Sequence, residues 1–118
     1  MKETSHTLKF GRHCTGFAFL NFVVIASAWA HNPVAECKLI ASDSIQCKGG
    51  FADGDNAAGM TVNLMSNDNK IIQAGKLGKD SMIIFKKPKG EFHVRFDAGS
   101  DDMIEIDHSE IRLGAFKN

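Results

Sequence analysis

Apolar and polar residues alternate along several short segments of the chain. The clearest is segment 91–97, where an apolar residue stands at every second position. Segment 60–66 repeats the pattern, with Met60, Val62 and Leu64 on one face. Because successive side chains of a β-strand point to opposite faces, this period of two predicts strands that bury one face and expose the other.

Turn-forming residues interrupt the chain every eight to twelve residues, and β-prone runs lie between them. This spacing, without a segment of long helical period, predicts an all-β chain. We expect a small antiparallel sandwich, Ig-like or prealbumin-like, of about seven strands. The expected strands are 36–41, 44–48, 60–66, 70–75, 81–86, 91–97 and 103–107. A short terminal element over 108–118 follows, in which Ile111, Leu113 and Phe116 are expected to close the core.

The alternation also predicts which side chains fill the space between the two sheets. They are aliphatic or aromatic, and within each expected strand they lie at one parity. The expected inward residues are Leu39, Ile45, Val62, Leu64, Ile72, Ile84, Phe92, Val94, Phe96, Ile104 and Ile106.

Segment 1–30 has the pattern of a signal peptide that is removed on export. Its start is positively charged, an apolar run covers 17–25, and Ala28-Trp29-Ala30 is a small-x-small cleavage site. The apolar run is about half of the ~20 residues that a membrane-spanning helix needs. We expect cleavage after Ala30 and a β-sandwich domain over 31–118. Cleavage after Ala28 and a retained N-terminal anchor are the alternatives.

Removal of the signal peptide changes the charge of the protein. It takes three of the 14 basic residues and one of the 14 acidic residues, which leaves a net charge near −2. Nucleic acids and anionic membranes need clustered positive charge, so neither is expected as a partner, and no membrane insertion of the mature chain is expected. The one basic cluster, Lys86-Lys87-Pro88-Lys89, is interpreted as a solvated hairpin turn.

Cysteine use agrees with export to the periplasm or beyond the cell. Cys14 leaves with the signal peptide, and Cys37 and Cys47 remain as an even pair. Their spacing suits a disulfide across a β-hairpin or between neighbouring strands. A redox pair usually has the shorter C-x-x-C spacing, and a zinc site needs more ligands. We therefore expect a structural disulfide.

Residues 49–107 carry a pattern of small-residue loop, alternating strand, hairpin and Phe96-Asp97-Ala98-Gly99 ending. This pattern resembles the carboxypeptidase-regulatory-like or prealbumin-like sandwich domains of exported bacterial proteins. The Ala-His start of the mature chain is also loosely similar to small periplasmic components associated with nickel or cobalt uptake. Such proteins often carry a histidine in the loop after the Asp-Ala-Gly element. Here that loop has Ser100-Asp101-Asp102, so the resemblance transfers no ligand to it.

Histidine offers the candidate metal chemistry. If His31 is the first residue of the processed chain, its amine and imidazole nitrogens form a chelate that suits Cu(II) or Ni(II). His93 and His108 are the candidate further ligands, and copper, nickel or cobalt are the candidate metals. The alternative is that all three histidines are simply solvated.

The Asp53-Gly54-Asp55 run begins like a calcium loop but lacks the later ligands, so it predicts a turn.

Catalysis has little support in the sequence, because it contains no G-x-S-x-G, H-E-x-x-H or C-x-x-C motif. We expect a noncatalytic exported binding or accessory module. Its expected partner is another envelope protein, within an envelope or membrane-transport assembly. The alternative is a periplasmic metal-binding protein that uses the processed N-terminal histidine.

Overall fold

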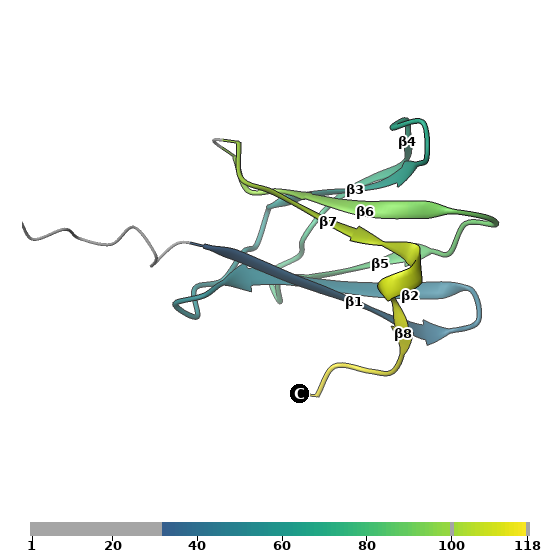
Figure 1. Cartoon of the computed structure of the whole chain (residues 1–118). Helices are drawn as coiled ribbons and strands as arrows, with labels where there is room; N and C mark the ends of the chain where they lie inside the picture. Colours follow the sequence, from purple (N-terminus) through teal and green to yellow (C-terminus); the bar gives the residue numbers. More distant parts are fainter. Residues whose placement is uncertain (1–31, 100, 118) are drawn as a thin grey trace, which may run out of the picture.

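The computed structural model describes residues 32–99 and 101–117, and these form an all-β sandwich (Figure 1). The expected signal peptide and His31 lie outside the described residues. The elements are β1 (Pro33–Ala41), β2 (Ser44–Phe51), β3 (Thr61–Ser66), β4 (Ile71–Lys76), β5 (Met82–Lys86), β6 (Phe92–Asp97), β7 (Met103–Asp107), the 3-10 helix η3 (His108–Glu110) and β8 (Arg112–Leu113). The prediction of an all-β sandwich is confirmed, with the two-residue β8 added to the seven expected strands.

The strands form two four-stranded sheets. Sheet A has the order β5-β2-β1-β8, and sheet B has the order β4-β3-β6-β7. All neighbours in sheet B are antiparallel, whereas β8 lies parallel to β1 in sheet A. Figure 1 shows the two sheets as stacked layers, with β4 and β5 as edge strands and β7 lying near β1.

The core lies between the sheets and is built by the alternation seen in the sequence. On β6, Phe92, Val94 and Phe96 are all 2 % exposed or less, while the residues between them face outward. On β3, Val62 and Leu64 are fully buried in the same layer. Leu39, Ile104 and Ile106 are partly buried against this cluster, as their parity predicts.

Two of the expected core residues are wrong. Ile84 is 59 % exposed, because Ile83 and Phe85 are the inward residues of β5 and pack opposite Cys47 and Ile45. Ile72 is 44 % exposed, because a bulge pairs Met65 with Ile71 and Leu64 with Gln73, which leaves Ile72 as an extra residue. In both places two adjacent isoleucines hide the phase of the alternation.

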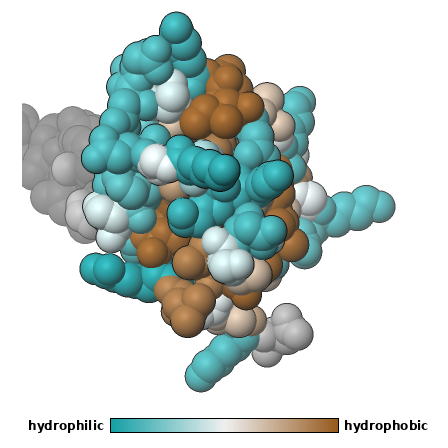
Figure 2. All heavy atoms as spheres, turned by 90° about the vertical axis from the view of Figure 1, so that its right-hand side faces the viewer, coloured by the Kyte–Doolittle hydropathy of each residue, from teal (hydrophilic) through white to brown (hydrophobic). Residues whose placement is uncertain are grey.

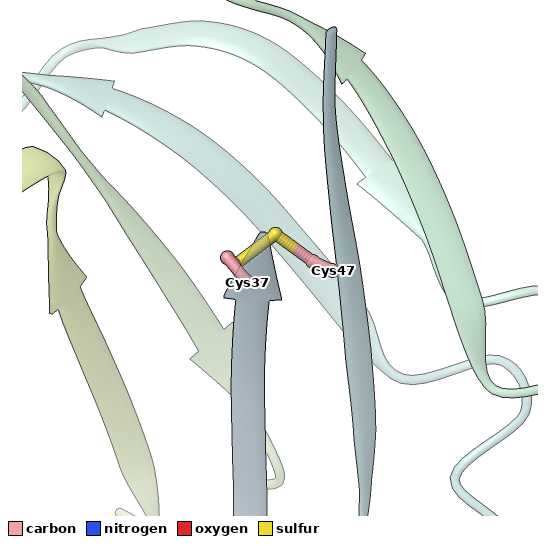
Figure 3. The surroundings of a disulfide bond; sticks show 2 residues. All are labelled: Cys37 and Cys47. Atoms are coloured by element: carbon pink, nitrogen blue, oxygen red, sulfur yellow. A yellow bond between two sulfur atoms is a disulfide. The ribbon is translucent and has the colours of Figure 1, made fainter. Parts of the chain in front are cut away.

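The disulfide is confirmed as a cross-strand bridge (Figure 3). Cys37 on β1 and Cys47 on β2 are directly opposite each other in the antiparallel register, with Cα atoms 4.0 Å apart. Both residues are buried and belong to the core cluster. A bridge that closes a loop of this length contributes about 2–4 kcal/mol to folding, which matters for a small domain.

The strands give the sandwich two distinct ends (Figure 1). At one end the carbonyl of Asn32 accepts a hydrogen bond from the Ala52 amide at 2.9 Å. At the other end the Lys87 amide donates to Asp43 at 2.7 Å, which joins the β5–β6 and β1–β2 turns. The η3 and β8 parts of the terminal element lie at this second end, which we call the turn end, whereas Phe116 lines a groove with Val34 and Asp55. At the turn end Ile111 packs on the core as expected, while Leu113 is 79 % exposed and does not.

Candidate functional site

His93 lies on the outer face of sheet B, near the turn end. Its neighbours in register are Met65 on β3 and Asp107 on β7. Its side chain is 14 % exposed, and its Nε2 atom lies 3.9 Å from a carboxylate oxygen of Glu105. Nε2 has no hydrogen-bond partner, and the buried Oδ1 of Asn63 on the same face has none either. Two unsatisfied polar atoms therefore lie close under the outer surface of sheet B.

Arg95 lies on the same outer face of sheet B. Its Nε donates to Glu105 at 2.8 Å, and its Nη2 donates to Asn69 at 3.3 Å. Because Glu105 is on β7 and Asn69 is in the β3–β4 turn, the arginine side chain is held across this face. Met65 on the same face is only 3 % exposed although it lies outside the main core.

His108 lies in η3 and packs against the core at the turn end. Its ring packs against Phe92 with centroids 5.6 Å apart, and its Nδ1 lies 3.2 Å from the Phe92 carbonyl oxygen. Phe92 is an inward residue and His93 an outward one, so the two histidines occupy different faces of sheet B. The described structure does not bring His93 and His108 into one ligand set.

The attachment point of His31 lies far from both of these histidines. Asn32 sits beside Ala52, whereas His108 lines a small cavity with Leu39 and Gly90 at the turn end. At about 3.3 Å per strand residue, the six steps from Pro33 to Leu39 span roughly 20 Å. In the described ranges 32–99 and 101–117, no three His, Cys, Asp or Glu side chains gather as a metal site. His31 itself is outside these ranges, so the metal site stays a prediction.

Ala52, which is hydrogen-bonded to Asn32, belongs to a loop that contains Asp53 and Asp55. Gly54 has a φ of 93°, and the Asp55 amide donates to the Asp53 carboxylate at 3.0 Å, which makes the turn expected from the sequence. A groove of about 610 Å³ adjoins the loop, lined by Val34, Lys48, Gly50, Asp55, Asp80 and Phe116 among others.

The edge of β5 is closed by side chains and loops. Gln73 on β4 reaches across the sandwich, donating to the Lys86 carbonyl at 2.8 Å and accepting from the Lys86 amide at 3.4 Å. At the other end of β5, the Met82 carbonyl accepts from Gly78 at 2.9 Å, and the Met82 amide donates to Asp80 at 3.0 Å. Only the backbone groups of Ile84 lie open between these two caps.

The edge of β4 is open. The Leu77 amide donates to Met60, so the alternating antiparallel ladder turns the backbone groups of Ala74 and Lys76 away from β3. No hydrogen bond in the described part of the chain reaches these outward groups. The bulge also leaves Ile71 exposed by 56 % and Ile72 by 44 %. In Figure 2, a hydrophobic patch lies near the top, at the height of β4 in Figure 1.

The other two edges differ from β4 in length and charge. β8 has two residues, which is too short to offer a ladder. β7 carries Glu105 and Asp107 on its outer face, with side chains about half exposed. A very short edge strand protects a sheet against unwanted pairing, and the carboxylates on β7 favour a partner of opposite charge. β4 places two exposed isoleucines beside two residues with free backbone groups, whereas β5 leaves only Ile84 open and β7 combines the exposed Met103 with carboxylates.

Sequence reasoning missed the β4 edge. From Ile71 to Gly75 the strand has no charged residue, and that signal is readable in the sequence. The order of strands in a sheet is not readable there, so the pattern cannot say that β4 lies at an edge.

In the part of the chain that the structure describes, no helix has the length and apolar character to cross a membrane. Comparison of the chain with protein-family models, with curated proteins and with solved structures finds no match in any of the three. The resemblance to carboxypeptidase-regulatory-like domains accordingly stays a prediction.

Proposed function

We propose that the protein is a noncatalytic exported binding module whose partner adds a β-strand to the β4 edge. The observation behind the proposal is the contrast between the capped β5 edge and the open β4 edge. β5 is capped at Met82 and Lys86, while β4 presents unpaired backbone groups at Ala74 and Lys76. An added strand gains main-chain hydrogen bonds from such an edge, and exposed apolar side chains next to it add contact area.

Export is supported by the buried Cys37–Cys47 disulfide, since such bonds persist in oxidising compartments. The cleavable segment 1–30 is the sequence feature that agrees with it. We propose the periplasm or the cell exterior as the location, and another envelope protein or a second copy of the chain as the class of partner.

A photo-crosslinking residue at position 74 tests this function in the cell that makes the protein. Ala74 is exposed and its backbone faces outward, so a strand added to β4 lies within reach of the crosslinker. The matched control position is Ile40 on β1 of sheet A, which is 36 % exposed.

A discrete covalent adduct at position 74, with none at position 40, is the expected result. The adduct contains either a second envelope protein or another copy of this chain. Equal labelling at the two positions, or none at position 74 in correctly folded and exported protein, contradicts the proposed function.

A further inference from the structure

The two outer strands of sheet B carry opposite charge. β4 is bounded by Lys70 and Lys76, whereas β7 carries Glu105 and Asp107. On the β7 side, aspartates at positions 97, 101 and 102 precede the strand. On the β4 side, Lys70 is paired with Asp68 and Lys79 is followed by Asp80, so Lys76 is the cation that remains on the strand itself. Sheet B therefore has a lysine at one edge and a group of carboxylates at the other, although the whole chain has a formal net charge of zero.

The backbone of β7 is available in the same way as that of β4. The Ala98 amide donates to the Asp102 carbonyl, so the alternating ladder turns Met103 and Glu105 away from β6. No hydrogen bond among the described residues reaches the outward backbone groups of these two residues. Each edge thus offers two alternate residues whose backbone N–H and C=O groups can pair with an added strand.

The strand directions match without any rotation of one copy against the other. Every neighbouring pair in the order β4-β3-β6-β7 is antiparallel, so β4 and β7 run in opposite directions. If a second copy is placed beside the first, its β4 lies antiparallel to the β7 of the first. Sheet B then continues from one molecule into the next.

The side chains at this junction are complementary. Lys76 is opposite Thr61 and Glu105 is opposite Arg95 in their own sheets, so both lie on the outer face, away from the buried Val62 and Val94. Whether Lys76 pairs with Met103 or with Glu105 of the next copy, its ammonium lies directly or diagonally across from a carboxylate. Two β7 edges would instead bring like charges together, and two β4 edges would gain no ion pair.

We propose that β7 of one copy adds to β4 of the next, so that the protein assembles head to tail through a continued sheet B. The inference rests on the proposed function, in that it uses the same open edge and names its occupant. A contact between two different surfaces does not close after two copies, so the assembly grows as a chain rather than stopping at a dimer. One added strand buries little surface, so the contact is weak, with a dissociation constant roughly between micromolar and millimolar.

Charge exchange at the junction tests the proposal by analytical ultracentrifugation of the exported, disulfide-bonded protein. The wild type is expected to gain mass with concentration at about 0.1 M salt, and to lose most of that gain at about 1 M salt, where screening shortens from about 10 Å to about 3 Å. Lys76→Glu and Glu105→Lys are each expected to weaken self-association at least about tenfold.

A one-to-one mixture of the two variants is expected to associate again, because every junction between unlike copies then joins opposite charges. The retained Lys76 of one variant meets the retained Glu105 of the other, and the exchanged positions 76 and 105 meet at the alternate junctions. Lys89→Glu makes the same charge change in the exposed β5–β6 turn and is expected to leave association unchanged. Because a misfolded variant cannot restore assembly, recovery in the mixture also shows that both variants fold.

A wild type that stays monomeric, or a mixture that stays as weak as its components, overturns the head-to-tail proposal. The crosslink at position 74 separates this failure from failure of the proposed function. An adduct with a different envelope protein, together with a monomeric wild type, keeps the binding edge and rejects the second copy as its occupant.

Discussion

At the scale of single residues, polar side chains form hydrogen bonds with backbone groups where the strands end. Asp107 begins η3 by accepting hydrogen bonds from the Ser109 hydroxyl and amide. These bonds, together with the nearby His108, lower the pKa of Asp107 below its ordinary value of 3.8. Since the folded pKa lies below the unfolded one, the carboxylate favours folding fully above about pH 3.8, and this contribution is lost as the pH falls through the folded pKa.

Replacement of Ser109 by alanine removes the largest of these causes. The pKa of Asp107 is expected to rise toward 3.8, followed by NMR of its carboxyl carbon during an acid titration. Ser66→Ala serves as the control. It is expected to raise the pKa of Asp68, whose carboxylate accepts from Ser66, without moving that of Asp107. An unchanged Asp107 titration in the Ser109 variant contradicts the assignment.

At the scale of strands, the sequence predicts where strands occur better than it predicts which of their side chains face the core. β6 alternates without ambiguity, and its inward and outward residues are as expected. In β5 the run Met82-Ile83-Ile84-Phe85 is apolar throughout, so either phase fits the sequence until pairing with β2 selects Ile83 and Phe85. The cap of Lys86 by Gln73 joins residues 13 apart on different sheets, and local pattern holds no information about such a contact.

Gln73→Ala is expected to reopen the β5 edge. It removes two hydrogen bonds to Lys86, each contributing about 0.5–1.5 kcal/mol, so we expect a loss of about 1–3 kcal/mol in unfolding free energy. The measurement is urea denaturation, with amide hydrogen exchange at Lys86 as the local readout. Asn56→Ala also removes two exposed bonds, one donated to the Lys79 carbonyl and one accepted from the Ala58 amide; it is the control and leaves Lys86 exchange unchanged. Unchanged exchange at Lys86 in the Gln73 variant means that Gln73 does not close the edge.

At the scale of the molecule, the fold class, the disulfide and most strand positions could be predicted from the sequence. The candidate site could not, because it depends on which strands lie at the edges. Two of the candidate histidines show what the sequence pattern cannot predict. His93 and His108 stand 15 positions apart in the sequence and lie near one end of the sandwich, yet they occupy different faces of sheet B. The face of the sheet on which a side chain lies depends on the register of strand pairing, which the residue types alone do not determine.

The difference between an open β4 edge and a closed β5 edge is measurable residue by residue as amide hydrogen exchange in dilute protein. The backbone amides of Ala74 and Lys76 on β4 are compared with that of Met82 on β5, which donates to Asp80. We expect the two β4 amides to exchange at least about tenfold faster than the Met82 amide. Equal or slower exchange at Ala74 and Lys76 would contradict an open β4 edge, because their amides would then already be hydrogen-bonded in the isolated molecule.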